Sequence, residues 1–191
     1  FFQAIDIETI KARVMRNAAT PTGLMIAPGI KGFVPEMNKR LPYDSEGAKK
    51  LLAEAGYPNG FEVGMNCPND RYVNDGEICQ AVAGMLARVG VKVNLEAETK
   101  VTYFPKILSR NTSFYLLGWT PGTYDAHNVL NAILGTPAPS GRGQFNLGGY
   151  SNARVDELVG LVQSETDQAK RNAMIAEAFK LHQDQVGHLP L

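Results

Sequence analysis

The sequence has no long hydrophobic run and no excess of charge of either sign. Its longest apolar stretch, from Phe114 to Trp119, is far too short to cross a bilayer. Nineteen basic residues balance nineteen acidic residues, so no net field would attract nucleic acid or an anionic membrane. We therefore expect no nucleic-acid partner.

A targeting segment is also missing from the sequence. The chain opens on FFQAI, without a starting methionine, a basic region or the apolar stretch of a signal peptide. We expect an excised fragment or the mature piece of a longer protein.

Cysteine is scarce. Only Cys67 and Cys79 are present, and neither has the close histidine or cysteine neighbours of a metal site. The pair permits one disulfide, but the spacing alone favours two unpaired thiols, with Cys79 packed on a helix. The redox compartment stays open at this point.

Catalytic motifs are lacking as well. The sequence contains no HExxH, GxSxG or GxxxxGK[ST] pattern, and its three histidines are scattered. His182 and His188 lie near the end of the chain, where a lone histidine is usually a surface or capping residue. The glycines at 141–149 miss the GxGxxG spacing, which favours a flexible or close-packing loop over a phosphate cradle. We expect no enzyme activity, no cofactor and no metal.

The composition is that of an ordinary soluble domain. Hydrophobic residues make up 44% and charged residues 20% of 191 residues. Residues 18–42 are rich in proline and glycine without periodicity, which indicates a long ordered connector. We expect a single domain spanning 1–191.

Three strands are predicted in the middle of the chain. Polar and apolar residues alternate at 61–67 and at 91–97, as in half-buried strands. The continuous apolar run at 114–117 is typical of a strand covered on both faces. With helices between them, these strands form a β-α-β-α-β unit, whose sheet should be parallel.

Helices are predicted from capping residues followed by apolar positions at helical spacing. We expect the two C-terminal helices to pack on the sheet, which gives an α/β fold with flanking helices. The predicted helix starts are Asp6, Asp44 or Ser45, an Asn74–Glu77 capping box, Thr102, Asn152 and Asp167.

A ligand site is expected beyond the carboxyl ends of the strands, where loops and helix starts converge. This rule selects residues 67–74, 98–102 and 119–128. If the strand order is 2-1-3, the first and third of these loops face one cleft.

The candidate ligand-contacting residues in these loops are Arg71, Tyr72, Trp119, Tyr124 and Asp125. A guanidinium can bind a carboxylate through two hydrogen bonds, an indole offers a flat apolar face, and an aspartate can hold an ammonium. Structural alternatives stay open: Arg71 as a solvated loop residue, Trp119 as a core residue, and Asp125 as the N-cap of the helix that follows.

Several segments, in this order along the chain, resemble one known family, the peptide-type extracellular solute-binding proteins of bacteria (family 5). The similarity extends over essentially the whole chain. The segments are 4–10 (AIDIETI), 43–61 (YDSEGAKKLLAEAGYPNGF), 89–93 (VGVKV), 117–119 (LGW) and 149–152 (GYSN).

This resemblance implies a periplasmic-binding-protein-like lobe of a two-lobed clamp that delivers solutes to an ABC importer, in the periplasm or tethered outside the cell. The chain would be the second lobe, inserted between the two halves of lobe I. Its partners would be a small-molecule or peptide ligand, lobe I of the same protein and an ABC permease in the membrane.

Site residues follow from the resemblance one by one. Arg71 falls where dipeptide-binding relatives have an arginine for the ligand carboxylate. Gly122 stands where we expect their aspartate for the ligand α-amino group, so peptide-amine recognition is not implied. Asp125 matches a later acidic position with a more structural role.

Two other functions use the same features. A ligand-sensing module could be built on the same clamp, and a small α/β enzyme could use the strand-end cleft. The enzyme would need a nucleophile–base pair or a cofactor fingerprint, and the sequence has neither.

Overall fold

The computed structural model describes all residues from 1 to 191. The chain divides into two compact units, one made of Phe1–Pro21 and Leu41–Gly118 and the other of Thr22–Arg40 and Trp119–Leu191. A single functional lobe over 1–191 stays a prediction.

The elements comprise seven α-helices, two strands and four short 3-10 or π-helical turns, the turns being labelled η. In chain order they are η1 (Phe2–Ala4), α1 (Ile7–Thr9), η2 (Ile10–Val14), η3 (Pro35–Met37), α2 (Ser45–Glu54), β1 (Phe61–Pro68), α3 (Asp75–Ala87), β2 (Val91–Glu98), α4 (Lys100–Leu108), α5 (Ala126–Val129), η4 (Leu130–Leu134), α6 (Ala153–Ser164) and α7 (Gln168–Asp184).

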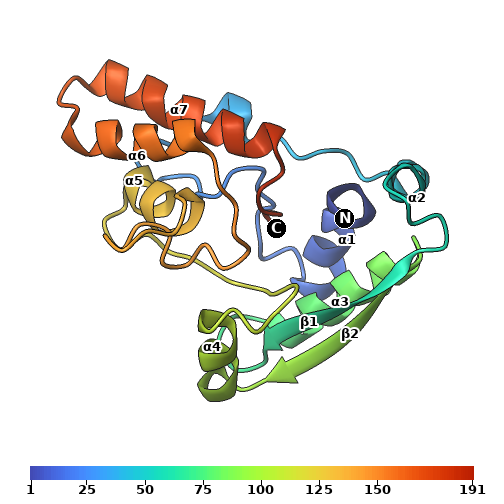
Figure 1. Cartoon of the computed structure of the whole chain (residues 1–191). Helices are drawn as coiled ribbons and strands as arrows, with labels where there is room; N and C mark the ends of the chain where they lie inside the picture. Colours follow the sequence, from blue (N-terminus) through green and yellow to red (C-terminus); the bar gives the residue numbers. More distant parts are fainter. The chain divides into compact units, whose positions relative to one another are not determined.

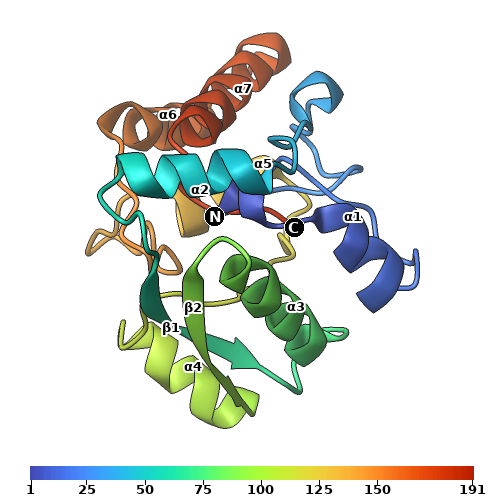
Figure 2. The same ribbon diagram turned by 90° about the vertical axis from the view of Figure 1, so that its right-hand side faces the viewer.

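The first unit is built on the predicted β-α-β motif. Strands β1 and β2 are parallel, with Phe61 opposite Val91 and Pro68 opposite Glu98. Helix α3 joins them and packs along both, while α4 packs against β1. Figure 2 shows α3 and α4 on opposite sides of the two strands. This confirms a parallel α/β core.

The predicted third strand is reduced to a single bridge, in which Tyr115 pairs in parallel with Asn66 of β1. The backbone N–H of Asn66 donates to Phe114 O (2.8 Å), and that of Leu116 donates to Asn66 O (3.2 Å). Beyond this point the next β1 donor to Leu116 O would be Pro68, which has no N–H, and that carbonyl accepts from the Tyr103 hydroxyl instead. The expectation of three full strands is therefore wrong, because the sheet has two strands and one further bridge. Its 2-1-3 order is present, since Asn66 pairs with both neighbours.

A disulfide joins Cys67 at the end of β1 to Cys79 on α3, with a Cα–Cα distance of 6.5 Å. The expectation of two unpaired thiols is wrong, because the β1–α3 turn brings the two cysteines together. Both are fully buried. Around them lies the core of this unit, formed mainly by Met65, Val82, Leu86, Val91, Tyr103 and Ile107.

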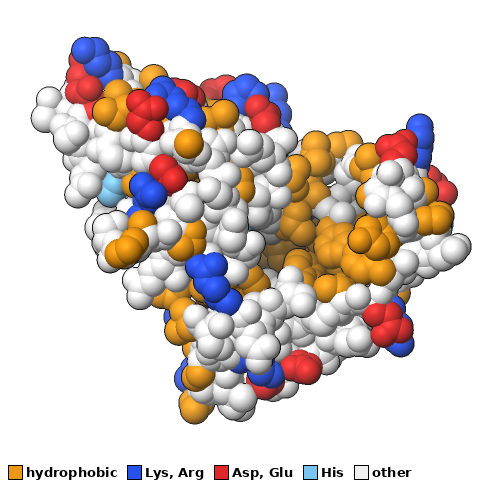
Figure 3. All heavy atoms as spheres, viewed as in Figure 1, with side chains coloured by type: hydrophobic (Ala, Val, Ile, Leu, Met, Phe, Trp, Pro, Cys, Tyr) orange, Lys and Arg blue, Asp and Glu red, His pale blue; other side chains and the backbone are white.

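An apolar surface lies in the first unit between the end of α2 and the start of β1. The Phe1 ring stacks on Phe61 at 6.1 Å, and Tyr57 lies 4.8 Å from Phe61. Tyr57 keeps 49% of its surface exposed and Leu51 keeps 53%. Figure 3 shows hydrophobic side chains gathered there, on the right-hand side of the view.

The second unit is helical. Helices α6 and α7 pack on each other, and α6 also packs on α5 and η4 (Figure 1). Their apolar faces form the core of this unit, and packing of these helices on the sheet stays a prediction. That core consists mainly of Leu24, Leu130, Leu134, Val155, Leu158, Ile175 and Phe179.

Capping residues predicted most helix starts correctly. Side chains of Asp6, Asp44, Asn152 and Asp167 each accept a hydrogen bond from the first turn of their helix. Helix α4 instead begins at Lys100, so a cap at Thr102 is wrong. None of the helices combines the length and the apolar character needed to span a bilayer.

Candidate ligand-binding site

The loop between β1 and α3 is organised from inside by a buried carboxylate. Asp75, only 3% exposed, accepts from the backbone N–H groups of Arg71 and Tyr72 through Oδ2, both at 2.9 Å. Its Oδ1 accepts from Gly76 N at 2.9 Å. Three backbone donors are thus satisfied by one side chain, as buried polar groups require.

The predicted Asn74–Glu77 capping box is not formed. Asn74 has a left-handed backbone (φ 55°) and makes no capping hydrogen bond. Its side-chain amide donates instead to Val14 O at 2.9 Å. Asp75, one residue later, organises the start of α3, and sequence reasoning missed it because Asn74 matched the same pattern.

Further bonds tie this loop to the loop after β2. Asn69 N donates to Glu98 O at 2.9 Å, and Lys100 N donates to Asp70 Oδ1 at 2.6 Å. The first two strand-end loops selected from the sequence therefore lie side by side.

Arg71 and Tyr72 extend from this restrained backbone. The Arg71 guanidinium lies 5.0 Å from the centre of the Tyr72 ring, a favourable cation–π distance. It has no ion pair within the chain, and the residue is exposed. The Tyr72 hydroxyl donates to Gly118 O at 3.2 Å. A Cβ at Gly118 would lie 2.7 Å from the Tyr72 ring, so this close approach requires glycine.

Trp119 is the first of the candidate site residues that belong to the second unit. Its indole N–H donates to Asn128 Oδ1 at 2.8 Å, and its ring lies 4.7 Å from that of Phe145. The residue is half-buried. It is therefore neither a fully buried core residue nor a free surface residue.

Gly122 and Tyr124 lie on the exposed turn that follows. A Cβ at Gly122 would meet nothing within 4 Å, and its φ lies outside the left-handed region. The backbone therefore does not require glycine there. Tyr124, by contrast, has a left-handed φ of 51° and is 68% exposed. Its carbonyl accepts from Lys31 N at 3.0 Å.

Asp125 has the structural role that the sequence left open. Its Oδ1 accepts from His127 N at 2.8 Å, which makes it the N-cap of α5. Both oxygens also accept from Arg171, at 2.8 and 3.0 Å. Burial alone would raise the pKa of the Asp125 carboxyl, but the hydrogen bonds from Arg171 and from His127 N outweigh it and lower that pKa. With its oxygens occupied, Asp125 is poorly placed to hold a ligand ammonium.

The six predicted site residues thus fall into two groups. Arg71 and Tyr72 lie together in the first unit, and Trp119, Gly122, Tyr124 and Asp125 lie in the second. That both groups face one cleft stays a prediction.

A histidine pair lies in the second unit, with His182 buried and His188 half-buried. His182 Nε2 and His188 Nδ1 are 2.8 Å apart, and the rings stack at 5.1 Å with Tyr150 edge-on to both. Burial and the neighbouring His188 lower the pKa of His182 to about 3. Burial lowers the pKa of His188 to about 4. The expectation of surface or capping histidines is wrong.

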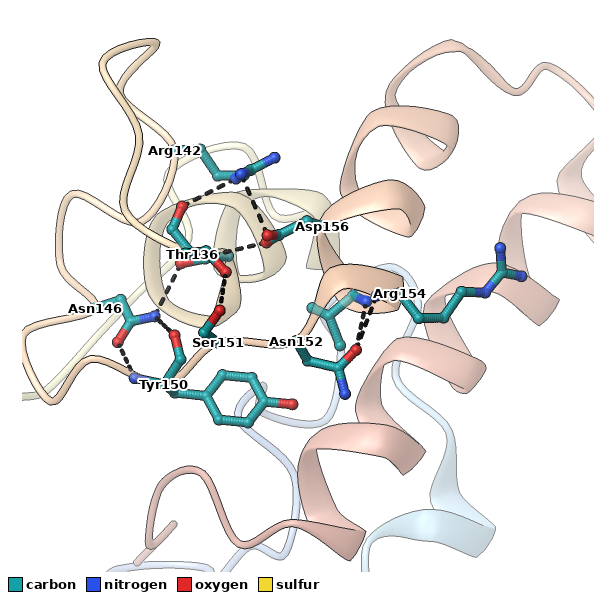
Figure 4. A network of polar contacts seen from close by, with 10 residues as sticks. Thr136, Arg142, Asn146, Tyr150, Ser151, Asn152, Arg154 and Asp156 are labelled. Carbon is teal, nitrogen blue, oxygen red and sulfur yellow. Dashed lines mark hydrogen bonds and ion pairs between the residues drawn. The ribbon is translucent and has the colours of Figure 1, made fainter.

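The glycine-rich segment is a close-packed loop. Asn146, fully buried, donates to the carbonyls of Gly135 and Tyr150 and accepts from Tyr150 N. Arg142 donates to Thr136 O at 3.0 Å and pairs with Asp156. Figure 4 shows this network between the loop and the start of α6. Because Arg142 is already paired, a phosphate cradle finds no support here.

The chain contains no group of three or more histidine, cysteine, aspartate or glutamate side chains placed to hold a metal ion.

Comparison with known proteins links this fold to one family. Residues 1–141 match the family described as bacterial extracellular solute-binding proteins, family 5 Middle. The match includes both strand-end loops of the first unit and the 119–128 segment of the second.

Curated relatives match over most of this chain but over a small part of their own length. Heme-binding protein A of Haemophilus influenzae is 27% identical over 98% of this chain and 34% of its own length. Glutathione-binding protein GsiB of Pectobacterium atrosepticum is 30% identical over 72% of this chain and 27% of its own. The chain therefore spans about a third of the length of such relatives.

A solved structure shares the fold of the whole chain. The periplasmic binding protein DppA from Helicobacter pylori, in complex with the peptide STSA, superimposes with a TM-score of 0.91. It is 23% identical, and the match covers 100% of this chain and 36% of that protein. The fold is therefore that of a periplasmic-binding-protein lobe.

Proposed function

Because the chain belongs to the bacterial extracellular solute-binding proteins of family 5, we propose that it is the second lobe of the substrate-binding component of an ABC importer. Proteins of this family bind solutes and are not enzymes, which removes the strand-end enzyme considered from the sequence.

The proposed mechanism is hinge closure. The solute binds between this lobe and lobe I of the same protein, and the closed form is the one that the membrane permease recognises. The share of relatives that the chain spans, 34% and 36% in two of them, agrees with one lobe of such a clamp.

The observation that carries the proposal is the exposed Arg71 guanidinium on an otherwise immobilised loop. Neighbouring polar groups at Asp70, Tyr72, Asn74 and Asp75 all have partners within the chain. Arg71 presents an exposed cation without an ion pair within the chain. A ligand carboxylate could accept two parallel hydrogen bonds from it.

The proposed ligand class is inferred from the exposed Arg71 guanidinium and from Gly122. We propose a peptide-like or other carboxylate-bearing small solute. Relatives are named for haem, for glutathione and for a bound peptide, and all three carry carboxylates. Gly122 supplies no carboxylate for an ammonium, although its backbone would accept a side chain, so recognition of a free amine is not part of the proposal.

The proposed location is the periplasm, or the outer face of a membrane. The Cys67–Cys79 disulfide supports it, because disulfides persist in oxidising compartments.

The test uses the complete protein and isothermal titration calorimetry. Glutathione and a panel of short peptides identify a carboxylate-bearing probe that binds, and its carboxamide analogue serves for comparison. Arg71→Ala should weaken binding of the carboxylate probe by about 2 to 5 kcal/mol, the cost of removing one partner from a buried charge pair. Binding of the carboxamide should change little.

Arg88→Ala is the matched control, since Arg88 is another exposed arginine of the first unit, at the end of α3. It should leave both affinities unchanged. Equal carboxylate affinity in Arg71→Ala and the wild type would remove Arg71 from the site.

A further inference from the structure

Two features converge on the backbone that carries Arg71 and Tyr72. The Asp75 carboxylate accepts from both of their backbone N–H groups at 2.9 Å. The Cys67–Cys79 disulfide closes the same loop over a sequence separation of 12 residues. All three of these side chains are buried, with Asp75 3% exposed and the cysteines fully buried.

We infer that Asp75 is a positioning residue for ligand recognition, assisted by the disulfide: it fixes the 69–75 loop so that the Arg71 guanidinium meets the ligand carboxylate in a preset orientation. The inference rests on the proposed function of Arg71. It goes beyond that function because Asp75 is buried and bonded to the loop backbone.

The physical reason lies in the cost of ordering a loop on binding. A flexible loop and a long arginine side chain lose conformational freedom when a ligand fixes them, and that loss reduces affinity. Asp75 removes this freedom before the ligand arrives, because two successive backbone N–H groups share one carboxylate oxygen.

The side chains above this backbone are restrained in turn. The Tyr72 hydroxyl is bonded to Gly118 O, and its ring provides the surface over which Arg71 lies at 5.0 Å. A shift of the loop backbone would therefore move Tyr72 and the guanidinium together.

An ordinary capping role would not need this geometry. Asp44 of α2, also in the first unit, shows what a plain cap looks like: its carboxylate accepts from Gly47 N at 2.8 Å, within its own helix, and the residue is exposed. Asp75 reaches backwards, out of α3, to residues three and four positions earlier.

The test measures Asp75→Asn in the complete protein, with the carboxylate probe and its carboxamide analogue chosen for Arg71. Asparagine keeps the size of the side chain but has one acceptor oxygen in place of two. We expect affinity for the carboxylate probe to fall roughly tenfold, as for the net loss of one hydrogen bond. Affinity for the carboxamide should stay within about twofold, and amide hydrogen exchange at Arg71 and Tyr72 should accelerate.

Asp44→Asn is the matched control, because it removes a carboxylate cap from the same unit. It should lower stability without changing the ratio of the two affinities. Should Asp75→Asn fail to fold, Cys67→Ala/Cys79→Ala loosens the same loop and should lower the same ratio.

The outcomes separate the two proposals. If the wild type does not distinguish carboxylate from carboxamide, the role of Arg71 fails and the inference fails with it. If the wild type and Arg71→Ala differ as expected but Asp75→Asn keeps the full ratio, or loses affinity for both probes equally, only the positioning role of Asp75 is overturned.

Discussion

The two units of this chain are stabilised by different means. The first is closed by a buried disulfide and a parallel strand pair. The second has neither, and relies on helix packing with polar contacts such as those of the buried Asn146 and of the His182–His188 pair. We therefore expect reduction of the disulfide to destabilise the first unit, and acid to destabilise the second.

The largest effect should come from acid on the second unit. Both imidazoles stay neutral in the folded state down to about pH 4, whereas in the unfolded chain they take up protons below about pH 6.5. The unfolded state therefore binds more protons in this window, and stability falls as the pH decreases through it. We expect a loss of roughly 3 to 5 kcal/mol between pH 7 and pH 4.5.

Urea unfolding of the 191-residue chain followed by Trp119 fluorescence measures this loss, because Trp119 is the single tryptophan of these residues and belongs to the second unit. The double variant His182→Gln/His188→Asn keeps a hydrogen-bonding pair that does not titrate, and it should show a much flatter pH dependence. An unchanged pH dependence would contradict this role of the pair.

The second largest effect should come from removing the disulfide of the first unit. Removing the disulfide with Cys67→Ala/Cys79→Ala should cost about 3 kcal/mol, as for a closed loop of this length. Hydrogen exchange should accelerate in β1, β2 and α3 but not in α6 and α7. Equal acceleration in both units would show that they unfold together and would break the comparison.

A smaller effect is expected within the second unit. Asp125→Asn should cost about 1 to 3 kcal/mol, because it leaves the mostly buried Arg171 guanidinium with weakened hydrogen bonds. Lys180→Gln is the control: it removes an exposed pair with Asp184 and should change stability by less than about 0.5 kcal/mol. Thermal unfolding monitored by circular dichroism compares the two variants, and equal shifts would contradict the account.

Local patterns predicted the local structure. Alternation located β1 and β2, and capping residues located α1, α2, α6 and α7, because these signals depend on neighbours within a few positions. The third strand was overestimated, since Pro68 of β1 has no N–H to continue the ladder, and the Leu116 carbonyl accepts from the Tyr103 hydroxyl instead. The 114–117 run does not reveal this limit, because Pro68 lies in the partner strand.

Contacts between segments that are distant in the chain could not be predicted from the sequence. Helical periodicity shows that α6 and α7 have an apolar face but not which surface covers it. Arg171 lies 46 positions from Asp125, and the cysteine spacing favoured unpaired thiols over the disulfide that is present. The role of Asp75 could not be predicted, because the neighbouring Asn74 fitted the capping pattern equally well.

The central claim is that the 69–72 loop and the 119–125 turn contact a solute. Hydrogen exchange by mass spectrometry on the complete protein, with and without a bound carboxylate probe, tests it most directly. We expect slower exchange in both segments when the probe is bound. Binding of the probe with unchanged exchange in both segments would contradict it.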